Sequence, residues 1–186
     1  MENTVICLQE HFLWDCQKNE ISKLIPTMTN FTRCSDSNEP ISNFKLPRGH
    51  AGVSILWPSE LNSKIKKLPD GNERIIAITI SCLPELLIIN AYMPTINTDS
   101  QLEYAECLDI ISDIVTKYRQ SYQIIICGDL NATLLDSRNN KHDRLLKDFI
   151  QEHGFHKEKR AVDKPTFYHH ANGGTSQIDY RWIQTF

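Results

Sequence analysis

The sequence lacks several features that would assign it to a specialised class of protein. No apolar run approaches the roughly 18–20 residues that a membrane-spanning helix needs, and the first ten residues show no basic region followed by an apolar stretch. We find no internal repeat and no low-complexity segment. The formal net charge of −3 gives no overall attraction to nucleic acid, so polyanion binding would require local basic clusters. We therefore expect an intracellular protein with no signal peptide, no transmembrane segment and no membrane partner.

The six cysteines contain no C-x-x-C pair, so a zinc site has little support. Cys7, Cys82 and Cys127 stand within apolar, strand-like runs, and we expect them to be small buried residues. All six are expected to be reduced thiols, as in other intracellular proteins.

The length of 186 residues, with 40% hydrophobic and 23% charged residues, suits one domain (1–186) with a single core. Apolar patterning predicts helices at 16–25, 100–118 and 143–153, and strands at 4–9, 51–57, 73–82, 85–92, 122–127, 166–168 and 178–183. Leu83-Pro84 is a tight connection that pairs the third and fourth strands as a hairpin.

The helix over 100–118 is predicted to begin with a capping box formed by Ser100 and Glu103. Its expected apolar face consists of Leu102, Ala105, Leu108, Ile111, Val115 and Tyr118. Hairpins of strands mixed with long helices favour an α/β fold in which two packed sheets are flanked by helices, a four-layer sandwich.

Polar residues recur where the predicted strands end. VICLQE ends on Glu10, INAYMP contains Tyr92, IIICGDLN ends on Asp129 and Asn131, and SQIDY contains Asp179. Such strand ends are where α/β proteins build sites. Mg²⁺ prefers carboxylate and amide oxygens, and cleavage of a phosphate diester needs such an ion, a positioned water and donors to the phosphate oxygens. The residue types therefore fit metal-assisted phosphodiester chemistry.

Each motif taken alone has a purely structural interpretation. Gln9-Glu10 can be a solvated turn, and Gly-Asp-x-Asn after a strand is often a turn in which Asp and Asn bond the local backbone. Asn-x-Tyr-x-Pro can be the exit of a hairpin with a half-buried tyrosine, and Ser-x-x-Asp-Tyr is weak by itself. The functional hypothesis depends on all four motifs occurring in one order at strand ends.

That order resembles the endonuclease/exonuclease/phosphatase superfamily, which includes apurinic-site endonucleases and the endonuclease domains of non-LTR retrotransposons. The matching stretches run from residue 5 to residue 182 and are ICLQEHF, GHAGVSILW, NERIIAITI, LLIINAYMPT, IIICGDLNA and PTFYHHANGGTSQIDY. QEHFLW, RGHAGV and the PTF…SQIDY segment are most similar to the retrotransposon branch.

The resemblance implies a role for each strand-end residue. Glu10 matches the metal-binding glutamate, and Tyr92 matches the tyrosine that hydrogen-bonds near the scissile phosphate. Asp129 matches the aspartate that orients or deprotonates the attacking water, and Asn131 the asparagine that contacts the phosphate. Asp179 matches the aspartate that orients the catalytic histidine. The implied reaction is single-step hydrolysis assisted by Mg²⁺ (or Mn²⁺), with no small-molecule cofactor.

Further positions match the family less directly. Thr166 and Ser176 match polar positions near the DNA backbone in the retrotransposon branch, and His50 lies in a loop where the family often places a substrate-facing residue. Asn90 and Arg74 also fit family positions, and we assign them structural or supporting roles.

The sequence departs from the family pattern at both ends. The family has an asparagine-bearing strand before the Gln-Glu strand and a Ser-Asp-His segment after the last strand matched here, so we expect a partial domain, truncated at both termini. None of the seven histidines matches the catalytic one by position. Flanking coding sequence, including a downstream reverse transcriptase, would test this expectation.

The resemblance predicts a monomeric, DNA-cleaving endonuclease that nicks one strand, and a retrotransposon origin implies nuclear action at some stage. The alternatives are a catalytically inactive nucleic-acid-binding remnant and a phosphatase of the same fold. Basic residues cluster at 64–67, 138–144 and 157–160, and the middle cluster of Arg138, Lys141 and Arg144 is favoured for DNA contact. The loop over 169–175 is similar to a hairpin that retrotransposon endonucleases place at target DNA, whereas Trp14, Trp57 and Trp182 are expected to pack in the interior.

Overall fold

The computed structural model describes residues 4–40, 48–135, 138–157, 165–168 and 175–184. Helical elements are η1 (Asp15–Gln17), α1 (Asn19–Leu24), η2 (Ser59–Lys64), α2 (Ser100–Tyr118) and α3 (Lys141–His153). Strands are β1 (Ile6–Gln9), β2 (Met28–Arg33), β3 (Val53–Pro58), β4 (Ile65–Lys67), β5 (Ile75–Ile80), β6 (Leu86–Tyr92), β7 (Gln123–Asp129), β8 (His156–Lys157), β9 (Phe167–Tyr168), β10 (Thr175–Ser176) and β11 (Asp179–Gln184).

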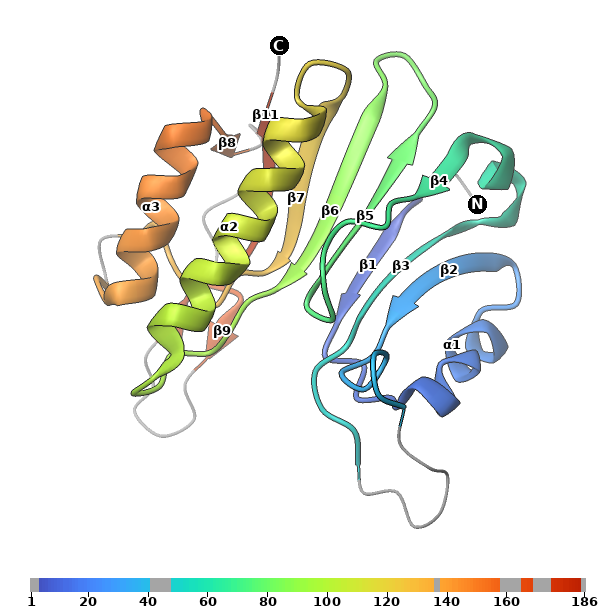
Figure 1. Ribbon diagram of the computed structural model, residues 1–186, viewed down its shortest axis with the longest axis horizontal. Helices are drawn as coiled ribbons and strands as arrows, with labels where there is room; N and C mark the ends of the chain where they lie inside the picture. Colours follow the sequence, from blue (N-terminus) through green and yellow to red (C-terminus); the bar gives the residue numbers. More distant parts are fainter. Residues whose placement is uncertain (1–3, 41–47, 136–137, 158–164, 169–174, 185–186) are drawn as a thin grey trace.

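Two sheets form the centre of the molecule. A six-stranded sheet has the order β4-β5-β6-β7-β11-β8, and a three-stranded sheet has the order β1-β3-β2. Helices α2 and α3 cover one face of the larger sheet, the smaller sheet lies on its other side, and α1 lies beyond β2 (Figure 1). The predicted α/β sandwich of two sheets flanked by helices is thus confirmed. Within the described part of the chain, no helix is long and apolar enough to span a membrane.

The larger sheet has a hydrophobic core on each of its two faces, because the side chains of its strands alternate between those faces. One face of β5, β6 and β7 packs with α2 and α3, in a core that includes Ile89, Ile111 and Phe149. The opposite face of β5 and β6 packs against β3, with Ile55 and Ile78 between the sheets. Because successive side chains of a strand point to opposite sides, a strand covered on both faces has a nearly continuous apolar sequence, as β5 does apart from Thr79.

Several predicted features of the elements are wrong in detail. Ser100 does not cap α2, since Asp99 holds the cap position and the Ser100 hydroxyl contacts Asn97 and His142 instead. Glu103 forms an ion pair with Arg74 rather than closing a capping box.

Two side chains that were predicted to be buried are on the surface. Leu102 is 69% exposed, and Tyr104 occupies the buried face of α2 in its place. Cys82 is also exposed, because it lies two residues beyond Ile80, the last residue of β5. Trp14, Trp57 and Trp182 are buried, as expected.

Candidate active site

Three of the predicted site residues form a row across adjacent strands. β6 and β7 are parallel and place Tyr92 opposite Asp129, while β11 is antiparallel to β7 and places Asp179 opposite Asp129. The last residues of two parallel strands therefore meet the first residue of an antiparallel strand at one edge of the sheet. This topology brings together side chains that are 37 to 87 positions apart in the sequence.

Glu10 reaches this row from the other sheet. It follows the last residue of β1 and has a left-handed backbone with φ of 54°, a conformation that is uncommon outside glycine. The Tyr92 hydroxyl donates a 2.6 Å hydrogen bond to Glu10 Oε1. The two sheets thus contribute one carboxylate and one phenol to a shared polar contact at their common end.

Asn90 ties the two sheets together just behind this contact. Its side chain is fully buried, and its Nδ2 donates to the carbonyl oxygens of Leu8 and Ser54, each at 3.0 Å. Its Oδ1 accepts from Gln9 Nε2 at 2.5 Å. A buried amide with these partners fixes the position of the end of β1, and therefore the position of Glu10, which follows it.

The Gly-Asp-Leu-Asn segment forms the turn that the structural interpretation predicted. Asp129 Oδ1 accepts from the Asn131 backbone N–H at 3.0 Å, and Asn131, with φ of 47°, donates from Nδ2 to the Met93 carbonyl at 2.8 Å. The turn leaves the second Asp129 carboxylate oxygen and the Asn131 side-chain oxygen Oδ1 without a hydrogen bond in the described ranges. The local turn therefore also orients the polar side chains of Asp129 and Asn131.

The electrostatics of the row differ from residue to residue. Burial, together with the negative charges of Asp179 and Glu10, raises the pKa of Asp129 to about 7, although the Asn131 N–H opposes the shift. Burial and the Glu10 carboxylate raise the pKa of Tyr92 well above its ordinary value. Tyr92 is consequently a donor at all physiological pH values, whereas Asp129 changes charge near neutrality.

Arg74 supports Tyr92 from the side of α2. Its guanidinium lies 5.4 Å from the centre of the Tyr92 ring and forms a 2.9 Å ion pair with Glu103. Its carbonyl also accepts from the Tyr92 N–H at 2.8 Å. These contacts fit the supporting role predicted for Arg74. They also involve Glu103, and the sequence pattern did not indicate that Glu103 lies beside the site.

The three predicted substrate-contact residues lie in different environments. Thr166 is exposed, and its hydroxyl accepts from the backbone N–H groups of Ile178 and Asp179, which fixes the start of β11. Ser176 is 4% exposed, and its hydroxyl has no hydrogen-bond partner in the described structure. His50 is exposed and packs edge-on against Trp14, at 5.4 Å between ring centres, rather than against the carboxylates.

No histidine of the described ranges contacts Asp179. His11 contacts the Arg33 carbonyl and the Leu13 N–H, His142 contacts Ser100, and His153 contacts Ser112. His169 and His170 lie outside the described residues, as does most of the loop over 169–175. The site as described contains the aspartate of the expected His–Asp pair without a histidine beside it.

The oxygen donors fit a hard divalent cation. Within the described ranges, no group of three or more His, Cys, Asp or Glu side chains is arranged to hold a metal by itself. Mg²⁺ does not require such a cage, because it binds through one or two carboxylates and keeps several waters. Glu10 is exposed at the rim, and its charge, with that of Asp179, raises the pKa of Asp129. A cation here would relieve this repulsion, so the donor set fits Mg²⁺ or Mn²⁺.

The basic cluster after Asn131 divides into two parts. Arg138 forms a 2.7 Å ion pair with the fully buried Asp143 carboxylate, and it also donates to the Asn131 carbonyl. That engagement makes Arg138 a structural residue instead of a free phosphate contact. Lys141 and Arg144 are both exposed at the start of α3. Of the cluster over 157–160, residues 158–160 lie outside the described ranges.

Comparison with known proteins identifies relatives of the sequence and of the fold. A family model described as endonuclease-reverse transcriptase matches residues 86–185, which is more than half of the chain and includes Tyr92, Asp129, Asn131 and Asp179. No curated protein sequence matches the chain significantly.

Solved structures with the same fold include nucleic-acid enzymes. The 3′ phosphatase NExo from Neisseria, bound to a product DNA hairpin, has a TM-score of 0.67 at 12% identity and is matched over 96% of this chain and 75% of that chain. The endonuclease domain of TRAS1, a telomere-specific non-LTR retrotransposon, has a TM-score of 0.60 at 16% identity over 90% and 76% of the two chains. The human Nocturnin catalytic domain has a TM-score of 0.60 at 16% identity over 96% and 68%. At these identities the likeness shows the fold.

Proposed function

Because the chain belongs to the endonuclease-reverse transcriptase family of the endonuclease/exonuclease/phosphatase superfamily, we propose that it is a Mg²⁺-dependent DNA endonuclease that nicks one strand. Membership supports a phosphodiester hydrolase. The observation that carries the more specific proposal is the row of Tyr92, Asp129 and Asp179, faced by Glu10 from the second sheet.

Each residue has a role that its environment suits. Asp129, when ionised, accepts a hydrogen bond or the proton of a water molecule whose oxygen attacks the phosphorus. Tyr92 and Asn131 supply neutral donors for the phosphate oxygens, with Tyr92 exchanging its bond to Glu10 for one to the substrate. Glu10 would hold Mg²⁺, which when bound neutralises the charge that develops on the phosphate and the leaving oxygen. Lys141 and Arg144 are candidates for backbone phosphate contacts.

Plasmid nicking tests the proposal directly. The purified chain is incubated with supercoiled plasmid and Mg²⁺ or Mn²⁺, and nicked circles are expected to accumulate. EDTA and the Glu10→Gln substitution should each suppress them, because both remove the proposed metal interaction. A chain that leaves the plasmid supercoiled with either metal would contradict the endonuclease proposal. Release of inorganic phosphate from a 3′-phosphorylated oligonucleotide, without nicking, would identify a phosphatase of the same fold.

The pKa of Asp129 gives a prediction that does not depend on turnover. In the metal-free chain we expect this carboxyl to titrate at about 7, and Mg²⁺ should lower the value because a nearby cation favours the ionised form. Carboxyl ¹³C chemical shifts, assigned with Asp129→Asn, measure both quantities. The nicking rate should rise with pH through the Mg²⁺-bound value. Titration at the ordinary value of 3.8, unaffected by Mg²⁺, would contradict the prediction.

One observation favours a second candidate function, which is nucleic-acid binding without hydrolysis. Asp179 has no histidine partner among the described residues, and such sites rely on an acid–base group. A gel-shift assay in low salt distinguishes the two functions. Binding that weakens steeply with salt, combined with no nicking in Mg²⁺ or Mn²⁺, would support the binding-only function.

A further inference from the structure

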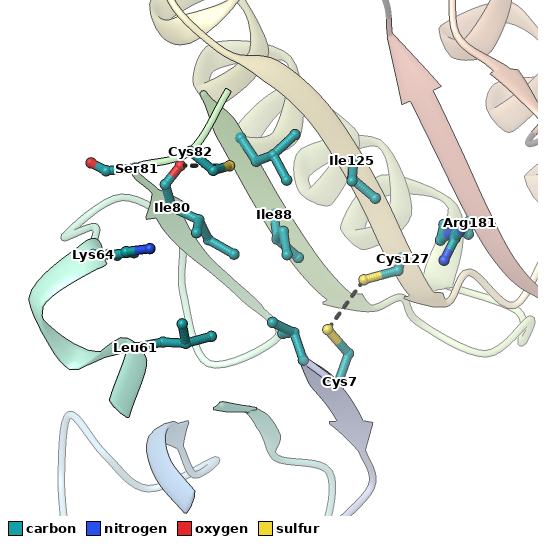
Figure 2. Close-up of a pocket in the computed structure, with 12 residues that line it drawn as sticks. Cys7, Leu61, Lys64, Ile80, Ser81, Cys82, Ile88, Ile125, Cys127 and Arg181 are labelled. Atoms are coloured by element: carbon teal, nitrogen blue, oxygen red, sulfur yellow. Dashed lines mark hydrogen bonds between the residues drawn. The ribbon is translucent and has the colours of Figure 1, made fainter. Parts of the chain in front are cut away.

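Two cysteine side chains from different sheets meet outside the candidate active site. Cys7 lies on β1 and Cys127 on β7, 120 positions apart in the sequence, and their sulfur atoms are 3.3 Å from each other. Figure 2 shows the two thiols directed toward one another. The Cys127 thiol donates the hydrogen bond to the Cys7 sulfur. All six cysteines of the chain are free.

The thiol pair is accessible from a cavity between the sheets. Cys7 and Cys127 are both partly exposed, and they line a cavity of about 380 Å³ together with Ile88, Ile125 and Arg181 (Figure 2). A cavity of this volume admits molecules the size of hydrogen peroxide or an alkyl hydroperoxide. The hydrogen bond between the thiols holds the pKa of Cys7 below its ordinary value and raises the pKa of Cys127, so Cys7 is the sulfur favoured as the reactive thiolate.

The strands that carry the pair lie close together. Some Cα atoms of β1 and β7 are within 8 Å of one another, and disulfides typically join Cα atoms that are about 4.4–6.8 Å apart. The sulfur atoms must approach by roughly 1.3 Å to reach the disulfide length of about 2.05 Å. β1 is an edge strand of its sheet, so within the described sheet it is held by strand pairing on one side only.

The remaining thiols differ from this pair. Cys34 and Cys107 are buried, and burial raises the pKa of Cys34 to about 12 and that of Cys107 to about 11, so neither is a ready nucleophile. Cys16 and Cys82 are exposed, and the Cys82 thiol, which lines the same cavity, donates to the backbone carbonyls of Ile80 and Pro84. Cys7 and Cys127 are thus distinguished by having each other as partners.

We propose that Cys7 and Cys127 form a modification site in which a hydroperoxide converts the facing thiols into a disulfide that joins the two sheets. The Cys7 thiolate attacks the hydroperoxide, the O–O bond breaks, and Cys7 becomes a sulfenic acid while the alkoxide or hydroxide takes up a proton. The Cys127 sulfur then attacks the Cys7 sulfur, and the S–OH bond breaks. The departing hydroxyl leaves with the Cys127 proton as water. The thiols lose two electrons in total, and the hydroperoxide gains them.

The disulfide would link the strands that present the candidate catalytic carboxylates. Cys7 stands three residues before Glu10 and Cys127 two residues before Asp129. A cross-link there restricts relative movement of β1 and β7. It also closes a long loop in the unfolded chain, which stabilises the folded state mainly by lowering the entropy of the unfolded state.

The test is peroxide treatment of the reduced, folded chain. Remaining thiols are blocked with N-ethylmaleimide, the protein is digested without reduction, and peptides are identified by mass spectrometry. We expect a linked peptide pair containing Cys7 and Cys127, removed by dithiothreitol. The oxidised protein should melt at a higher temperature than the reduced one. Cys82→Ser should keep the linked pair, whereas Cys127→Ser should lose it and leave Cys7 as a sulfenic acid that dimedone traps.

Two results would overturn the proposal. One is that Cys7 and Cys127 are both recovered as maleimide adducts while the exposed Cys16 and Cys82 are oxidised. The other is that Cys7 pairs with all five remaining cysteines to the same extent in the folded chain as in the urea-unfolded chain. Both results come from the unsubstituted protein, so they hold even if a serine variant fails to fold.

Discussion

Asp129→Asn is expected to lower the rate of metal-dependent nicking by roughly 10²–10⁴-fold, the range typical for losing a positioned acid–base group. The substitution keeps the size of the side chain and the oxygen that accepts from the Asn131 N–H, so the turn after β7 is retained. It removes the negative charge and the ability to accept a proton. Single-turnover nicking with saturating enzyme isolates this step from DNA binding.

The stability of the same variant separates catalysis from folding. The folded-state pKa of Asp129 is raised to about 7 from 3.8, so its favourable contribution to folding is complete below about 3.8 and is lost as pH rises through about 7. Above neutrality the ionised, half-buried carboxylate therefore opposes folding. Asp129→Asn should be at least as resistant to urea as the parent chain at pH values above about 7.

A matched control is Asp113→Asn, at an exposed position of α2. It makes the same chemical change on the surface and should leave both the nicking rate and the urea midpoint unchanged. A nicking rate for Asp129→Asn equal to that of the control, with normal DNA binding, would remove Asp129 from the mechanism.

The sequence order of the motifs was sufficient to predict which residues stand at strand ends, but not how those ends are held together. Glu10, Asp129 and Asn131 follow runs whose apolar pattern is strong, so their positions could be read directly. That Tyr92 donates to Glu10, and that Asn90 bonds the backbone of β1 and β3 in the facing sheet, depends on how the sheets pack. Contacts between residues 82 apart leave no local pattern in a sequence.

The features that sequence patterns misplaced are those in which a tertiary contact outweighs a local one. Ser100 and Glu103 have the spacing of a capping box, yet each finds a partner elsewhere, His142 and Arg74 respectively. Strand β2 was not predicted because all six of its residues are only partly buried, so its sequence MTNFTR has no apolar run or clear alternation. Its place is set by pairing with β3.

The glycine that opens the Gly-Asp-x-Asn motif has a purely steric role that can be tested. Gly128 has φ of 130°, and a Cβ atom added there would lie 2.0 Å from the Ala91 carbonyl oxygen on β6. Since Ala91 and Gly128 are paired in the parallel ladder, neither backbone can move without separating β6 from β7. The motif therefore needs glycine for the close approach of two strands whose next residues are Tyr92 and Asp129.

Gly128→Ala is accordingly expected to destabilise the fold by about 3–5 kcal/mol, since it combines a strained backbone with a clash against main-chain atoms. Urea denaturation followed by circular dichroism measures the loss. Gly154→Ala is the matched control: Gly154 also has positive φ, of 66°, but an added Cβ would meet no atom within 4 Å, so its cost should be only the roughly 1–2 kcal/mol of left-handed backbone. If the two variants lose equal stability, positive φ alone explains the glycine, and the close packing of β6 on β7 is not what requires it. If Gly128→Ala loses more stability than Gly154→Ala, the spacing that sets Tyr92 beside Asp129 depends on the absence of a side chain at position 128.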